Sequence, residues 1–137
     1  MAFVFGFFSD AALTTQINTA LVFNQVAGSS TPDDKVVYYG GPTGYQVKAQ
    51  SDPGVDQITV SVVDAAGGSG SPASDVKLAL TSGGLAGATG GAALNLGTVI
   101  NGGAANAVPV HIRVTDSTGM TGLNTDLGLT TNALYQY

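Results

Sequence analysis

Alternation of apolar and polar residues is the feature that most constrains the fold of this chain. Segment 108–114 reads Val-Pro-Val-His-Ile-Arg-Val, with a branched apolar residue at every second position. Segment 58–62, Ile-Thr-Val-Ser-Val, and segment 76–80, Val-Lys-Leu-Ala-Leu, repeat the same period. A period of two places one face of an extended strand in a core and the other in water. We therefore expect an all-β protein.

Turn residues separate these segments at regular intervals. Further strand candidates are 3–7, 19–23, 36–39, 45–49, 94–96 and 127–131. Turn signals rich in Gly, Pro and Asp fall at 32–34, 40–44, 52–54, 67–72, 83–84, 90–91, 101–103 and 116–119. Short strands about ten residues apart are typical of an antiparallel sandwich or barrel, here with long Gly-rich loops. Pro109 predicts that its strand lies at a sheet edge or begins at a bulge. The long loop 85–93 is a candidate for function or contacts.

The composition excludes several classes of protein. A length of 137 residues predicts one domain, 1–137, and the charge of −5 with only four Lys and Arg excludes a nucleic-acid partner. The absence of Cys excludes disulfides and thiol chemistry. No apolar run approaches the roughly 18 residues of a membrane helix, so we expect no membrane partner. A surface this poor in charge fits a chain that is partly covered in an assembly.

Few residues are available for catalysis. His111 is the only His, and its position in an alternating strand predicts a solvent-facing residue rather than a general base. Glycoside hydrolysis would require paired carboxylates in an aromatic cleft, and the chain contains no Trp. We expect no enzyme and no cofactor. Calcium binding is the alternative for four loop carboxylates, although the role of Asp as a turn-forming residue explains most of these positions. These residues are Asp52, Asp56, Asp116 and Asp126.

Aromatic residues gather at the two ends of the sequence. Phe3, Phe5, Phe7 and Phe8 fall in residues 1–8, which form either a first strand in the core or an N-terminal arm on a neighbouring subunit. Tyr135 and Tyr137 form the second group, and Tyr is favoured at protein interfaces. The predicted interface comprises these six residues.

Five segments carry a resemblance to a known class of protein. They are 8–15 (FSDAALTT), 34–40 (DKVVYYG), 52–60 (DPGVDQITV), 92–97 (AALNLG) and 103–114 (GAANAVPVHIRV). Together they resemble small structural proteins of tailed bacteriophage virions that have an immunoglobulin-like β-sandwich. The resemblance implies a non-enzymatic virion component, most simply a capsid decoration (cement) protein that binds and stabilises the outer shell. Its partners would be the major capsid protein or other virion proteins, and further copies in a homo-oligomer.

Two alternatives remain open on the sequence. One is a tail, neck or baseplate accessory protein. The other is a carbohydrate-binding or receptor-binding β-sandwich module, which requires an aromatic platform. The tyrosines available near a loop for such a platform are Tyr38, Tyr39 and Tyr45.

Overall fold

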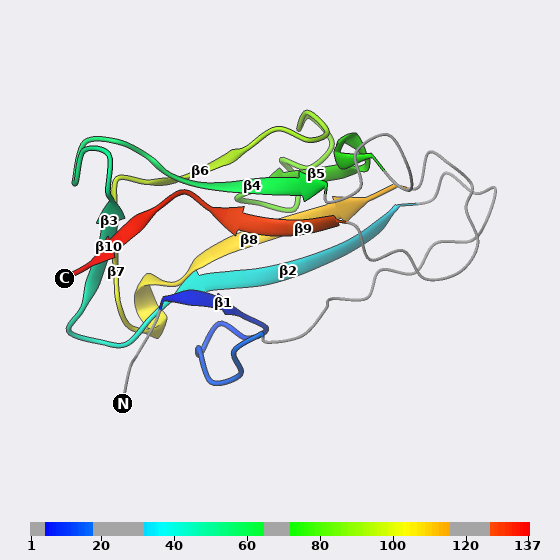
Figure 1. Cartoon of the computed structure of the whole chain (residues 1–137). Coiled ribbons are helices and arrows are strands. Elements are labelled where there is room, and N and C mark those ends of the chain that lie inside the picture. The colour runs from blue at the N-terminus through cyan, green and yellow to red at the C-terminus, as the bar shows by residue number, and fades with distance from the viewer. Residues whose placement is uncertain (1–4, 18–31, 65–71, 116–126) are drawn as a thin grey trace.

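A computed structural model describes residues 5–17, 32–64, 72–115 and 127–137, which form ten β-strands and two 3-10 turns (Figure 1). The strands are β1 (Gly6–Phe8), β2 (Asp33–Gly40), β3 (Gln46–Ala49), β4 (Ile58–Asp64), β5 (Val76–Ala79), β6 (Leu94–Gly97), β7 (Val99–Asn101), β8 (Val108–Val114), β9 (Leu127–Thr131) and β10 (Leu134–Gln136). The 3-10 turns are η1 (Ala73–Asp75) and η2 (Ala104–Asn106). Each strand pairing is antiparallel, and the described residues contain no α-helix, so the predicted all-β class is confirmed. The candidate strand 19–23 lies outside the described residues.

One layer is a four-stranded sheet in the order β1-β2-β8-β5. The prediction that Pro109 marks an edge strand is wrong, because β8 lies in the interior of this sheet. The physical reason is local. Strand β5 pairs only with His111 to Val114, so Pro109 faces β2 on one side and has no β5 partner on the other. A residue without an amide hydrogen is tolerated at such a position.

The second layer is bent and consists of two three-stranded sheets, β6-β4-β9 and β10-β3-β7. Strand β9 leads into β10 across residues 132–133, and β6 leads into β7 across Thr98. The central strands of the two sheets, β3 and β4, are joined by the loop of residues 50–57. Strands β10 and β7 therefore follow almost directly from β9 and β6, whereas a loop with a turn separates β3 from β4, and Figure 1 shows the small sheet at one end of the molecule.

Asn132 joins the two parts of the second layer at the bend. Its side-chain oxygen accepts a hydrogen bond from the Thr59 amide at 3.0 Å, and its side-chain nitrogen donates to the Gln57 carbonyl at 3.0 Å. On the other side of β4, the register shifts between Ile58 and Thr59, and Gly97 adopts a φ of +112°. The Asn132 amide also donates to the Thr59 carbonyl at 3.3 Å, so the Asn side chain supplements backbone pairing where the strands change direction.

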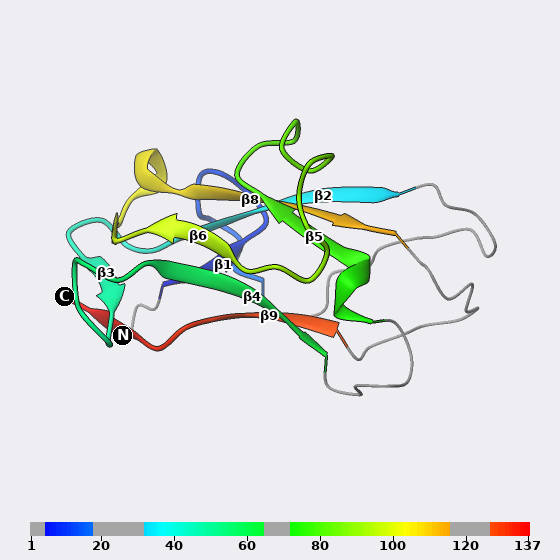
Figure 2. The same ribbon diagram turned by 90° about the horizontal axis from the view of Figure 1, so that it is seen from above.

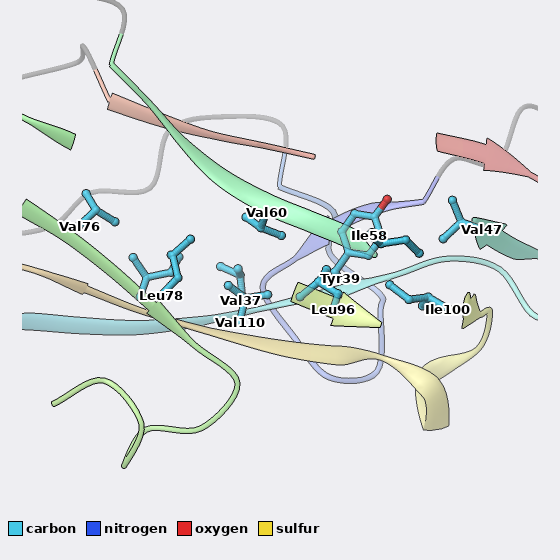
Figure 3. Packing of buried hydrophobic residues seen from close by; sticks show 11 residues of the cluster. Val37, Tyr39, Val47, Ile58, Val60, Val76, Leu78, Leu96, Ile100 and Val110 are labelled. Carbon is cyan, nitrogen blue, oxygen red and sulfur yellow. The ribbon is translucent and has the colours of Figure 1, made fainter. Parts of the chain in front are cut away.

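The core lies between the layers and draws on every sheet (Figure 3). Val37 and Val110 come from the four-stranded sheet, and they meet Ile58 and Val60 of β4. Figure 2 shows β2 and β8 along one side of the molecule and β4 and β9 along the other. Burying each such side chain contributes about 1.5–3 kcal/mol. Two antiparallel layers around one apolar core are compatible with the expected β-sandwich.

The loop between β5 and β6 is anchored to the core. Its Leu85 side chain is fully buried, and the Gly91 amide donates a 2.8 Å hydrogen bond to the Val76 carbonyl. This hydrogen bond also covers part of the outer edge of β5. The loop therefore has a structural role, in addition to any contact it makes with other molecules.

Candidate functional site

Two of the six predicted interface residues pack within this chain. The Phe7 ring lies 5.2 Å from the Tyr39 ring at 69°, an edge-to-face contact, and the Phe5 ring lies 6.4 Å from it. Both phenylalanines pack against the core. Residues 6–8 are the first strand of the sheet, and Phe3 lies outside the described residues.

A folded-back segment covers the outer edge of β1. The Ile17 amide donates to the Phe7 carbonyl at 2.9 Å, and the Ser9 amide donates to the Thr15 carbonyl at 3.0 Å. Asp10 holds the turn, because its carboxylate accepts hydrogen bonds from the Thr14 hydroxyl and from nearby amides. These bonds lower the pKa of Asp10. Covering an edge strand in this way prevents it from pairing with other chains.

Phe8 points to the opposite side, where the outer face of the four-stranded sheet carries an apolar row. Phe8 pairs with Tyr38, and Tyr38 pairs with Pro109 on β8, so these three side chains share the face turned away from the core. The next row joins Val36 to His111. All of these side chains are half-buried. The solvent face of an antiparallel sheet is ordinarily polar, so we define Phe8, Val36, Tyr38 and Pro109 as the apolar patch.

An ion pair marks the far end of the same face. The Arg113 guanidinium donates to both Asp34 carboxylate oxygens, at 2.8 and 2.9 Å. This bidentate contact lowers the pKa of Asp34 and raises that of Arg113. His111 lies one row away on β8, on the face turned away from the core as the alternating pattern predicts, although its side chain is half-buried instead of fully solvent-facing.

The small sheet β10-β3-β7 carries the second aromatic group on its outer face. One row across it is Tyr135, Lys48 and Val99, and the next is Tyr137, Gln46 and Asn101. We define these six residues as the tyrosine face. The rings of Tyr135 and Tyr137 meet edge to face at 6.5 Å, and the Lys48 Nζ lies 4.7 Å from the centre of the Tyr137 ring. Both tyrosines are about half exposed, at 50% and 52%.

An open pocket of about 420 Å³ adjoins the tyrosine face. Its lining residues are Gly44, Tyr45, Gln46, Asn101, Gly102 and Tyr137. Sequence reasoning included Tyr137 and Tyr45 in separate predictions and missed Gln46 and Asn101. A usable signal was present, because Gln46 and Lys48 occupy the polar positions of the alternating segment 45–49.

The three tyrosines that a binding module would have had available, Tyr38, Tyr39 and Tyr45, do not form one aromatic platform. Tyr38 and Tyr39 are neighbours on one strand, so their side chains point to opposite faces. Tyr39 is only 3% exposed and belongs to the core, while Tyr45 is 46% exposed and lies in the pocket. Burial raises the pKa of Tyr39 to about 12.

The two described loop aspartates, Asp52 and Asp56, lie in a turn. The Asp52 carbonyl accepts hydrogen bonds from the amides of Val55 and Asp56, and the Ser51 hydroxyl donates to the Asp56 carboxylate. Asp116 and Asp126 lie outside the described residues. Within the described ranges no group of three His, Cys, Asp or Glu side chains is close enough to hold a metal ion. The same part of the chain contains no helix that could span a membrane.

Comparison of the chain with protein-family models, with curated proteins and with solved structures gives no match. The two surfaces described above, the apolar patch and the tyrosine face with its pocket, are therefore the basis for the functional proposals.

Proposed function

We propose that this protein is a non-enzymatic structural component of a virion, namely a decoration protein that binds the outer capsid shell through the apolar patch. Its partner is the major capsid protein or another virion protein, alongside further copies of the same chain. The observation that carries the proposal is the half-buried row Phe8, Tyr38 and Pro109 on the sheet face turned away from the core. A half-buried apolar row of this kind is suited to a protein contact, and a repeating shell multiplies weak contacts.

The strand order supports the finer, immunoglobulin-like assignment. The order β1-β2-β8-β5 corresponds to the A-B-E-D sheet of immunoglobulin domains. One departure is that β6 and β7, which pair with the second layer, come between the equivalents of strands D and E. The assignment requires these two strands to be an insertion.

Purified particles provide the test. We expect the chain to be present in them, and we expect F8S/Y38S to lower its occupancy at least about tenfold, equivalent to about 1.4 kcal/mol. Val63→Ser is the matched control, because Val63 is an exposed apolar residue on β4 in the other layer. It should bind as the unchanged chain does.

Half-buried positions can affect folding, so a second variant is required. Val36→Lys places a charge within the apolar patch while leaving its neighbours intact, and thermal unfolding would verify its stability. Weak occupancy by a folded V36K supports the proposal. Absence of the chain from particles, or unchanged occupancy of V36K and F8S/Y38S, would overturn it.

A further inference from the structure

The pocket beside the tyrosine face combines two phenol rings with two primary amides. Among the described residues, no Asp, Lys, Arg or His side chain lines it, and the remaining lining residues are Gly44 and Gly102. The pocket is a depression of about 420 Å³ that is largely open to solvent. Its lining offers aromatic surface for stacking and amide groups that donate and accept hydrogen bonds.

A tight turn fixes the position of Tyr45. The Tyr45 amide donates to the Pro42 carbonyl at 3.4 Å, and Gly44, at the third position of this turn, has a φ of +91°. A positive φ at that position is the requirement of a type II turn and is met by Gly. The Gly102 amide then donates to the Tyr45 carbonyl at 2.7 Å, which ties the turn to the chain after β7.

Close backbone packing is needed at the floor of the pocket. A Cβ atom at Gly102 would lie 1.7 Å from the Pro42 carbonyl oxygen, so only Gly allows this approach. The Asn106 side chain donates to the Gly102 carbonyl at 2.9 Å and holds the segment from the other side.

Tyr137 is also held by the backbone. Its amide donates to the Gln46 carbonyl at 2.7 Å, and its carbonyl accepts from the Gln46 amide at 3.0 Å. Lys48 and Tyr135 contact its ring, and neither residue lines the pocket. The backbone of both tyrosines is therefore fixed, and Lys48 and Tyr135 also hold the Tyr137 ring, which reduces the entropic cost of binding at that ring.

Sugars have the surface chemistry that these groups recognise. The C–H bonds on one face of a pyranose ring form an apolar surface that stacks on an aromatic ring. Its hydroxyl groups donate and accept hydrogen bonds, and the amides of Gln46 and Asn101 can do both. A phosphorylated or acidic ligand would need cations in the lining, and the nearby Lys48 is directed at the Tyr137 ring.

We infer that this pocket binds a neutral saccharide, with Tyr45 and Tyr137 stacking on sugar rings and with Gln46 and Asn101 binding hydroxyl groups. The open side of the pocket lets a longer glycan continue into solvent. The site is independent of shell attachment, because the apolar patch lies on the other layer. A chain that binds the shell through one surface can display the pocket on another.

The test is NMR titration of the full chain with cellotriose, chitotriose and mannotriose at millimolar concentration, with sialyllactose as the charged comparison. We expect at least one neutral trisaccharide to shift the signals of Tyr45, Asn101 and Tyr137, and to bind more tightly than sialyllactose. Tyr45→Ala, Tyr137→Ala and Asn101→Ala should each weaken binding about tenfold or more.

Tyr135→Ala is the matched control, because Tyr135 is equally exposed and touches Tyr137 without lining the pocket. Its binding should stay within about twofold of the unchanged chain. Thermal unfolding of each variant would verify folding, and N101A changes no aromatic packing.

Failure of all three neutral sugars to bind would overturn the inference. So would stronger binding of sialyllactose, binding unaffected by Y45A, Y137A and N101A, or an equal loss in Y135A. None of these outcomes bears on shell attachment, which the particle experiment tests separately.

Discussion

The inward-facing aromatic residues at β1 and β2, namely Phe5, Phe7 and Tyr39, and the three tyrosines in and beside the small sheet have similar chemistry and opposite environments. Phe5 and Phe7 surround Tyr39, which is 3% exposed, whereas Tyr45, Tyr135 and Tyr137 are 46–52% exposed. The first group stabilises the contact between the layers. The second is held in place by backbone hydrogen bonds and leaves its rings open to solvent. Aromatic content alone therefore does not identify an interface, because strand register decides which rings face outward.

The largest difference should appear on removing Tyr39. Tyr39→Ala leaves a cavity where two phenylalanine rings converge, and we expect a loss of about 3–5 kcal/mol in the free energy of unfolding. Urea denaturation at neutral pH would measure it. A loss below about 1 kcal/mol would mean that the aromatic cluster of β1 and β2 contributes no more than the exposed tyrosines do.

High pH provides a second comparison at the same residue. Burial raises the pKa of Tyr39 from 10.0 to about 12, so the unfolded chain loses this proton before the folded chain does. Titration of Tyr39 leaves the free energy of unfolding unchanged below pH 10. Between pH 10 and 12 it lowers the free energy of unfolding by about 1.4 kcal/mol for each pH unit. Tyr39→Phe removes the titrating group, so this part of the decline should be absent from its urea denaturation profile across the same range. Identical slopes for both chains would contradict the burial of the phenol.

The tyrosine face should respond most strongly to a change in the backbone beneath it. Gly102→Ala forces the chain away from Pro42, and we expect a loss of about 1–3 kcal/mol together with shifted NMR signals at Tyr45 and Gln46. Gly83→Ala is the control, since its Cβ would meet nothing within 4 Å. A G102A chain as stable as G83A, with unshifted signals, would show that the pocket floor is not closely packed.

The smallest effect is predicted for an exposed ring. Tyr135→Ser removes an exposed aromatic ring from β10 and its edge-to-face contact with Tyr137. It should change the free energy of unfolding by less than about 1 kcal/mol. Thermal and urea denaturation would both be suitable. A loss as large as that of Y39A would remove the distinction between the two aromatic groups.

The alternation of apolar and polar residues predicted much of the fold. It identified β4, β5, β8 and β9 to within a few residues, because each has one buried face that requires a period of two. The three-residue strands β7 and β10 were not predicted as strands, since three residues carry too little periodicity. Pairing with β3 defines both of them, and pairing across long sequence separations is not visible in local pattern.

The candidate sites were less predictable than the fold. The exposure of Tyr135 and Tyr137 agrees with the expected interface group, although their contact with a partner remains a prediction. Gln46 and Asn101 are 55 positions apart in sequence, and only the pairing of β3 with β7 brings them together. The resemblance to virion proteins gave an expectation of function and no site residues, so both surfaces were located from strand register.

The bend at Asn132 has a mechanical consequence for the tyrosine face. Residues 132–133 join β9 to β10 and Thr98 joins β6 to β7, so a pull on a glycan bound as inferred above would be transmitted along these two short connections into the larger sheet. Such tension would load neighbouring hydrogen bonds together instead of peeling them apart one by one. If the protein binds a particle and a glycan as proposed above, a recognition surface built in this way would resist drag on that particle.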